Sequence, residues 1–213
     1  MLILNYTMNK FIFFTALFRY WIQKKNPVYE MLMKEKVVLD IACGEGELLQ
    51  KNPEKIHGID INPTMVSKLQ KLGLQVKEGN VVELPYQDDF FEVVHCSNII
   101  EHLAPADAYR MFQEMFRVLK PGGKIILVTP MPKTIWYSFG HVKPYPPQSI
   151  KKLFRAVSME AFDSIQGLGV GDTFYYGRSI ANKFTFLIST IFANLAPETF
   201  AGSYLMVISK YEK

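Results

Sequence analysis

The stretch Val37–Leu49, VVLDIACGEGELL, decides the fold. Its first part is a short β-branched run, which is typical of a buried parallel strand. Glycine-bearing sequence follows, and an apolar pattern comes after it, so we expect the chain to leave the strand through a turn into a helix. In that arrangement backbone N–H groups at the helix start can approach a polar or anionic ligand without obstruction by side chains. The stretch therefore indicates a ligand site at the end of a strand.

Strand patterns alternate with helical patterns from Lys36 to Pro130, and an irregular proline-rich segment follows. The clearest helical pattern is Ala106–Lys120, which has one apolar face and ends at the helix-breaking sequence KPGG. This alternation predicts an α/β fold with a doubly wound, mostly parallel seven-stranded sheet that is Rossmann-like, an antiparallel last strand and helices on both faces. Strands are expected at 36–42, 56–61, 74–79, 90–97, 123–130, 159–167 and 202–213, and further helices at 148–157 and 183–195.

The composition is that of one ordinary globular domain. The chain has 213 residues, of which 49% are apolar and 21% charged, so disorder and coiled coils are excluded. We expect residues 1–213 to form a single domain with a cofactor-binding core at 36–157. A helical cap at 1–30 would precede this core, and an apolar helical insertion at 173–200 would precede the last strand.

Charge and cysteine content exclude several classes of partner. The net charge of +4 is mild and scattered, so no nucleic acid partner is expected. Cys43 and Cys96 lie far apart in apolar stretches, which favours buried, inert thiols in a reducing compartment. No CxxC pair or Cys/His cluster suggests a metal. The first residues lack a basic region and a small-residue cleavage site, so we expect a cytoplasmic protein and no secretion signal.

Aromatic residues make up 14% of the chain and concentrate at its two ends. As a helix, the N-terminal segment would have a wide apolar surface and only a thin polar stripe, but its uncharged runs are too short to span a bilayer. It can be a packing helix over the domain, a membrane-interface helix or a removable segment. The helix at 183–195 is similarly apolar and suits a membrane interface or a homodimer contact. We therefore expect a lid or acceptor-facing surface that can touch a membrane from one side.

Asp60 indicates the kind of ligand. It stands 20 positions after Asp40 at the end of the second strand, where an acid binds the hydroxyls of a ribose, although alone it could be a helix N-cap. A dinucleotide site would need a third glycine about where Leu49 stands, and Glu45 and Glu47 would repel a pyrophosphate. A zwitterionic or cationic nucleoside fits better, because Asp40 can orient an ammonium group.

These residues resemble the class I S-adenosylmethionine-dependent methyltransferases, particularly the small-molecule branch called methyltransferase type 11. The segment 78–103 is similar to the family's adenine and fourth-strand region, and RVLKPGG at 117–123 is similar to its lead into the fifth strand. The resemblance covers about residues 36–157. The glycine-rich motif of the family (acid, any, small, any, Gly, any, Gly) is matched, with alanine in place of the first glycine, by Asp40, Ala42, Gly44 and Gly46.

The resemblance implies S-adenosylmethionine as the cofactor and assigns a role to each matching position. Asp40, Ala42, Gly44 and Gly46 would surround the methionine portion. Asp60 would bind the ribose hydroxyls, and Ile61 would pack on the adenine. Asn80, with Val81 after it, would present polar groups to the adenine edge. Ser97 and Asn98 would line the floor below the sulfonium.

The histidines are the candidate general bases for a hydroxyl acceptor, which would be a small molecule or linked to a lipid or glycan. His57 and His95 lie within strand patterns and are expected to be structural. His102 and His141 fall above the sheet, where an acceptor must sit; His102 could instead orient the cofactor or cap the next helix. Ubiquinone-pathway O-methyltransferases that resemble this stretch hold a divalent metal with acidic residues and the histidine. Asn98 occupies one of those acidic positions, so no metal is expected.

The alternatives belong to other functional classes. A subunit of the same fold could bind S-adenosylmethionine without catalysis or activate a partner. A nicotinamide-dependent reductase is disfavoured by the missing third glycine and the acidic turn. A macromolecule methyltransferase remains open, although the sequence SNIIEH after the fourth strand differs from the motif that holds a planar amino group.

Overall fold

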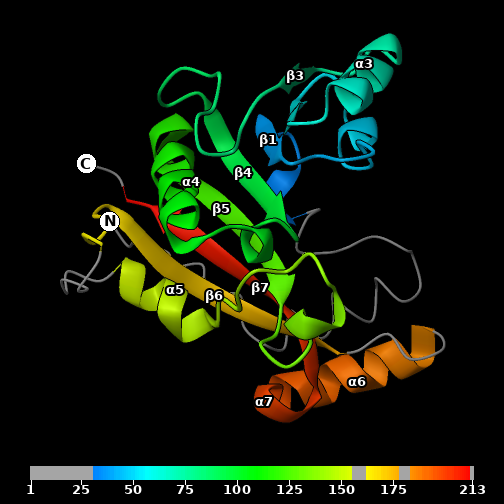
Figure 1. Cartoon of the computed structure of the whole chain (residues 1–213), viewed down its shortest axis with the longest axis vertical. Helices are drawn as coiled ribbons and strands as arrows, with labels where there is room; N and C mark the ends of the chain where they lie inside the picture. Colours follow the sequence, from blue (N-terminus) through cyan, green and yellow to red (C-terminus); the bar gives the residue numbers. More distant parts are fainter. Residues whose placement is uncertain (1–30, 155–161, 178–182, 212–213) are drawn as a thin grey trace.

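The computed structural model describes residues 31–154, 162–177 and 183–211, in which seven strands form one sheet (Figure 1). The strand order is β3-β2-β1-β4-β5-β7-β6. The strands β1 to β5 pair in parallel, and β7 runs antiparallel to both of its neighbours, so the predicted sheet is confirmed. The strands are β1 Val38–Ile41, β2 Ile56–Asp60, β3 Val76–Glu78, β4 Phe91–Ser97, β5 Leu119–Pro130, β6 Leu168–Gly177 and β7 Ala201–Lys210.

Helices cover the sheet because alternate strand residues point to opposite faces. On one face, buried residues of β1, β4, β5 and β7 pack against α4 and α5; on the other, α3 and the 3₁₀ helix η1 pack near β1 and β2. Figure 1 shows α6 and α7 beyond the ends of β6 and β7. The expected cap at 1–30 lies outside the described residues. The helices are α3 Pro63–Lys71, α4 Pro105–Val118, α5 Pro147–Leu153, α6 Lys183–Leu195 and α7 Pro197–Phe200, and η1 is Leu49–Lys51.

The helix expected directly after the glycine-bearing turn is wrong. The chain forms only η1 before β2 begins at Ile56. The short connection and Pro53 explain this, because proline disfavours helical backbone at the residue before it and cannot donate a helical hydrogen bond. The turn after β1 therefore presents backbone N–H groups from a loop and not from an α-helix.

The sixth strand lies further along the chain than expected. Residues 162–167 contain one bridge and a turn, and the strand runs over Leu168–Gly177, so 173–177 are strand and not helical insertion. Gly167 takes a left-handed backbone, with φ of +87°, that ends the turn. The glycines of this segment weaken the local strand signal, and the strand forms because it pairs with β7. The helix expected at 183–195 is confirmed as α6.

Lys210 fixes the end of β7 to the junction of α4 and β5. Its side chain is almost buried, and its ammonium group donates to the carbonyls of Phe116 at 2.9 Å and Leu119 at 2.5 Å and to Asp89 Oδ1 at 2.6 Å. The cation thus satisfies two main-chain acceptors that sit beside the sheet.

We predict that Lys210→Met lowers the free energy of unfolding by about 1–3 kcal/mol, because it leaves these acceptors without a donor. Urea denaturation followed by circular dichroism measures the loss. Lys124→Met is the matched control, since the ammonium group of Lys124 makes one long contact, 3.4 Å to Ser209 Oγ. Equal losses in the two variants would contradict this role for Lys210.

Candidate functional site

The carboxyl ends of β1, β2 and β4 lie side by side and bring the predicted site residues together. Ile41 pairs in register with Ile59 on β2 and with Cys96 on β4, so the residues that follow each strand meet at one edge of the sheet. In open α/β sheets ligands bind at the carboxyl ends of the strands, at the point where the connections from two neighbouring strands run to opposite sides. The change of direction occurs here between β1 and β4.

Asp60 links the end of β2 to the turn after β1. Its Oδ2 accepts a hydrogen bond from Gly44 N at 2.9 Å, and its Oδ1 accepts one from Asn62 N at 2.9 Å. Asn62 is the N-cap of α3, because its side chain accepts from Thr64 N and Met65 N. The alternative of Asp60 as the helix cap is therefore wrong, and its carboxylate holds the turn while each oxygen keeps a further lone pair.

Glycine is required at the two glycine positions of the turn for different physical reasons. Gly46 has a φ of +72°, and a Cβ there would lie 2.7 Å from the side chain of Leu69 on α3. Gly44 has a φ of +50°, and a Cβ there would meet no atom of the described residues within 4 Å. Ala42 replaces the first glycine of the motif yet has a φ of +54°, a conformation that costs an L-residue about 1 kcal/mol. Gly46 thus serves packing, while Gly44 leaves space beside Asp60 for a ligand.

One of the two acidic side chains in the turn is paired. Glu45 Oε2 accepts from the ammonium of Lys68 at 2.8 Å, and both side chains are largely exposed. This pair weakens the argument that Glu45 repels a pyrophosphate. The preference for a zwitterionic nucleoside then depends on Asp40 and on the missing third glycine.

The residues predicted for the adenine lie on the same edge but differ in exposure. Ile61, directly after Asp60, is 69% exposed, which is unusual for an isoleucine beside a core strand. Asn80 is exposed and its Oδ1 accepts from Val82 N at 3.2 Å, while Gly79 N donates to the carbonyl of Asp60. The side chain of Val81 is buried in the core, so only its main chain can face a ligand.

Asp40 forms a buried pair that sequence reasoning missed. His95 Nδ1 lies 2.6 Å from Asp40 Oδ1, and both residues are buried, with 5% and 6% exposure. They pair in register on neighbouring parallel strands, and this register is a long-range feature that no local sequence pattern indicates. The imidazole thus holds the carboxylate that was expected to orient an ammonium group.

The end of β4 carries the two residues predicted for the floor of the site. Asn98 has a φ of +54°, and its N–H donates to the carbonyl of Val128 at 2.9 Å. Its side-chain amide donates to Ser97 Oγ at 3.2 Å. These bonds fix the direction in which the chain leaves β4 beside β1.

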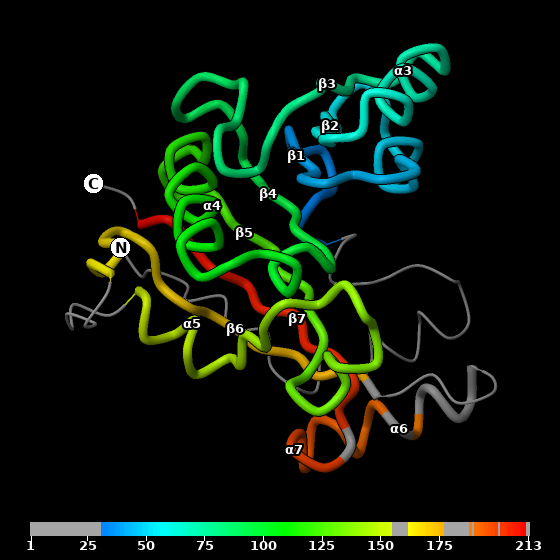
Figure 2. The backbone as a smooth tube through the Cα atoms, in the orientation of Figure 1, coloured from blue at the N-terminus to red at the C-terminus, as the bar shows by residue number. Residues whose placement is uncertain are grey.

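His102 and His141 are brought together from two segments. Their ring centroids are 4.7 Å apart, and Figure 2 shows the yellow-green segment after β5 returning beside the segment after β4. His102 Nδ1 lies 3.0 Å from the carbonyl oxygen of Gly140, and His141 Nδ1 lies 2.5 Å from that of Ile135. Since a carbonyl only accepts, Nδ1 carries the proton in both rings when they are neutral, and Nε2 keeps a lone pair.

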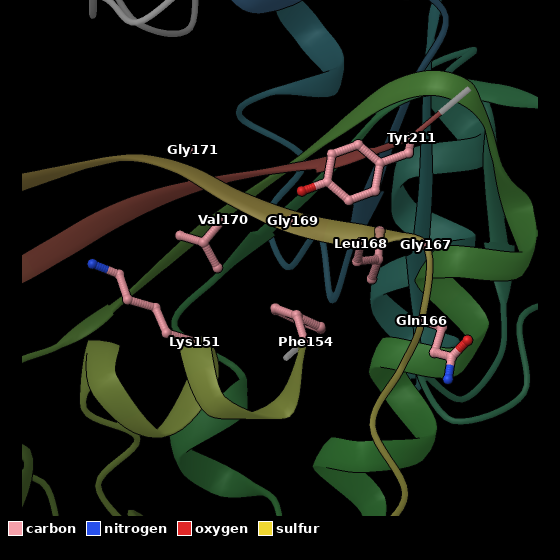
Figure 3. Close-up of a pocket in the computed structure, with 9 residues that line it drawn as sticks. All are labelled: Lys151, Phe154, Gln166, Gly167, Leu168, Gly169, Val170, Gly171 and Tyr211. Carbon is pink, nitrogen blue, oxygen red and sulfur yellow. The ribbon is translucent and has the colours of Figure 1, made fainter. Parts of the chain in front are cut away.

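A separate groove of about 600 Å³ lies at the other side of the sheet, along the start of β6 (Figure 3). The side chains of Lys151, Phe154 and Tyr211 project toward it, and glycines of β6 form much of its wall. None of the predicted site residues lines this groove. It is therefore distinct from the edge formed by β1, β2 and β4.

The two cysteines are buried on opposite faces of the sheet, since Cys43 and Cys96 belong to different hydrophobic clusters. Burial raises the pKa of Cys43 to about 12, and the carboxylates of Asp40 and Asp60 add to this. Burial also raises the pKa of Cys96 well above its usual value. Both thiols are therefore protonated at neutral pH, as expected for inert cysteines.

We predict that neither thiol of the folded protein reacts with Ellman's reagent at pH 8 within minutes, because the thiolate is the reactive form. Both should react at once in guanidinium chloride, and the absorbance of the released thiolate measures this. A fast-reacting thiol in the native protein would contradict the burial of these side chains.

The chain is similar in sequence to known methyltransferases. Residues 38–123 match the family described as "Methyltransferase domain". The chain is 30% identical over 172 residues to a "Probable S-adenosylmethionine-dependent methyltransferase" of Mycolicibacterium smegmatis, covering 76% of this chain and 65% of that protein. It is 32% identical over 116 residues to a "Demethylmenaquinone methyltransferase" of Oceanobacillus iheyensis, covering 48% of each. The chain thus spans less than two thirds of these relatives.

Solved structures share the fold. The crystal structure of a "SAM dependent methyltransferase" from Archaeoglobus fulgidus superposes with a TM-score of 0.62 at 19% identity, covering 95% of this chain and 100% of that one. A second structure, described as an S-adenosylmethionine-dependent methyltransferase from Mesorhizobium loti, gives a TM-score of 0.60 at 17% identity, covering 87% and 96%.

Proposed function

Because this chain carries a class I S-adenosylmethionine-dependent methyltransferase domain, we propose that it transfers a methyl group from S-adenosylmethionine to a hydroxyl. The acceptor would be a small molecule or a group linked to a lipid or glycan. The observation that carries the proposal is the Asp60 carboxylate bound to Gly44 N at 2.9 Å, beside open space at Gly44 and the exposed side chain of Ile61.

The residues at this edge fit the cofactor part by part. The free lone pairs of Asp60 can accept from ribose hydroxyls, and Ile61 offers an apolar surface to the adenine. Asp40 can bind the ammonium group of the methionine portion, and its bond to His95 fixes the orientation of that carboxylate. Gly44 leaves room for close approach to the main chain. When bound, S-adenosylmethionine supplies a methyl group on a positively charged sulfur.

On the acceptor side, the chain's own groups would position the hydroxyl and receive its proton. His102 and His141 supply Nε2 lone pairs next to the end of β4, and each ring is oriented through Nδ1 by a main-chain carbonyl. A positioned base of this kind contributes typically 10²–10⁴-fold to a rate. Relatives described as C-methyltransferases leave carbon as the alternative acceptor atom.

Exposed apolar side chains after β5 and on α6 support the proposal of an apolar or lipid-linked acceptor. Trp136, Tyr137 and Phe139 follow β5 and are 62%, 74% and 107% exposed. On α6, Phe192 and Leu195 are exposed as well. No helix among the described residues is long and apolar enough to cross a membrane. We propose a cytoplasmic protein whose exposed aromatic side chains contact a membrane from one side by entering the interface.

A non-catalytic subunit that binds S-adenosylmethionine, or activates a partner, is the rival from another class. Incubation with labelled S-adenosylmethionine and metabolite or lipid extracts separates the two. A methyltransferase forms S-adenosylhomocysteine and labels an acceptor, whereas a binding subunit forms neither. The intact Gly44, Gly46 and Asp60 support the enzyme.

We predict that Asp60→Ala weakens the binding of S-adenosylmethionine about 10- to 100-fold, because a charge-assisted hydrogen bond to the ribose contributes about 1.5–3 kcal/mol. Isothermal titration calorimetry measures the change. Asp60→Asn keeps an acceptor for the main chain and separates loss of binding from loss of the turn. Glu54→Ala removes an exposed carboxylate before β2 and should bind like wild type; equal affinity in Asp60→Ala would contradict the proposal.

We also predict that the double variant Trp136→Ser, Phe139→Ser binds phosphatidylcholine vesicles about 30-fold more weakly, since each aromatic side chain buried in the interface contributes about 1 kcal/mol. Co-sedimentation over a lipid titration measures the partition. Leu72→Ser, at the end of α3, removes an equally exposed apolar side chain elsewhere and should have no effect. Unchanged binding of the double variant would show that this segment does not contact lipid.

A further inference from the structure

Three potential metal ligands converge beside the acceptor side of the proposed site. Glu101, His102 and His141 each offer one ligand atom, and these atoms all lie within 4.8 Å of one another. Glu101 and His102 belong to the 3₁₀ helix η2 (Ile100–His102) that follows β4, and His141 belongs to the segment that follows β5. Residues distant in sequence are thus gathered at the carboxyl ends of two neighbouring strands.

Glu101 is the observation that points to a missing partner. It is fully buried at 0% exposure, and its Oε2 accepts from Thr129 Oγ1 at 2.9 Å, whereas its Oε1 has no hydrogen-bond partner among the described residues. No ion pair involves Glu101 in the described part of the chain. A buried carboxylate without a compensating charge is costly, so the position of Oε1 beside two imidazoles favours a bound cation.

The two histidines are oriented as metal ligands usually are. A metal-bound imidazole commonly donates its other ring N–H to a carbonyl or carboxylate, which fixes its tautomer and orientation. His102 and His141 both have Nδ1 at a main-chain carbonyl, so their Nε2 lone pairs remain for a cation. The bonded carbonyls belong to Gly140 and Ile135.

The main chain holds the two ligand-bearing segments together. Val142 N donates to the carbonyl of Glu101 at 2.8 Å, and Lys143 N donates to the same oxygen at 3.4 Å. With the contact between His102 and Gly140, these bonds tie residues 140–143 to η2. The ligands are therefore placed near one another by structure that does not depend on the metal.

We propose that Glu101, His102 and His141 hold a divalent transition-metal cation, for which Zn²⁺ is the best match. Two imidazoles and one carboxylate suit zinc and its neighbours, whereas Mg²⁺ and Ca²⁺ prefer sites made of oxygen ligands. Three protein ligands leave a coordination position open, as in catalytic zinc sites. The sequence predicted no metal because Asn98 replaces an acid; His141, from another segment, supplies a ligand that the local motif does not contain.

The role of the cation rests on the proposed function, although its binding does not. A hydroxyl oxygen in the open position would be bound by the cation, which lowers the pKa of that hydroxyl, so its proton passes to water. The Nε2 lone pairs then bind the metal, and the histidines orient the acceptor instead of taking its proton.

The test is calorimetric titration of ZnCl₂ into protein freed of metal with a chelator, without S-adenosylmethionine or acceptor. We expect one equivalent to bind, and Co²⁺ to give the absorption bands of a histidine-bound ion. His141→Gln and His102→Gln should each weaken zinc binding more than about 100-fold, because each removes a direct ligand. His57→Gln is the matched control, since His57 lies on β2 among aromatic rings and should bind zinc like wild type.

Two outcomes would overturn the proposal: no zinc binding by wild type, or binding that survives both His102→Gln and His141→Gln. The histidine variants decide the matter because Glu101→Gln alters a buried residue that folding needs. Asp60→Ala, which removes the proposed ribose contact, should keep its zinc affinity. Zinc binding without S-adenosylmethionine binding would therefore refute the proposed function and leave the metal site intact. S-adenosylmethionine binding without zinc binding would refute the metal site and leave the proposed function intact.

Discussion

The hydrogen bond from Gly44 N to Asp60 joins the turn after β1 to the end of β2, and the arrangement of the candidate site depends on it. Without a full helix after the turn, this segment has little regular structure of its own to hold it. The carboxylate replaces what a helix would supply, since it accepts from Gly44 and from Asn62, directly before α3. One side chain thus binds both the turn and the residue that caps the next helix, while each of its oxygens keeps a further lone pair.

Buried charge is handled differently on the two sides of the edge. The carboxylate of Asp40 has a partner within the sheet, because His95 Nδ1 on the neighbouring strand lies 2.6 Å from Asp40 Oδ1. Within the part of the chain that the structure describes, the Glu101 carboxylate accepts from the hydroxyl of Thr129 alone, a neutral donor that stabilises a carboxylate less than a cation does. The contact with His95 thus involves one oxygen of Asp40, whereas Glu101 Oε1 faces no cationic side chain of the described residues.

Much of this was accessible from the sequence, and the physical reasons for the exceptions are specific. The strands β1 to β5 and the helices α4 and α6 follow local periodicity, so they were predicted within a few residues. The position of β6 was wrong because its glycines weaken the local signal, and its pairing with β7 is a long-range effect. Asp60 and the glycines follow a motif, but the contacts of His95 and His141 depend on register and on a loop path that no local pattern encodes.

The boundary between β1 and β4 is where the two halves of the site meet. On one side, the β1 turn and the ends of β2 and β3 offer main-chain N–H groups, a carboxylate and an exposed isoleucine, which suit a nucleoside. On the other side, the segments after β4 and β5 offer imidazoles and exposed aromatic rings, which suit a reacting hydroxyl on an apolar carrier. The pairing of Asp40 with His95 crosses this boundary, so the carboxylate nearest the expected ammonium group is oriented from the acceptor side. In the proposed reaction, the sheet register would therefore set the positions of the two substrates relative to one another.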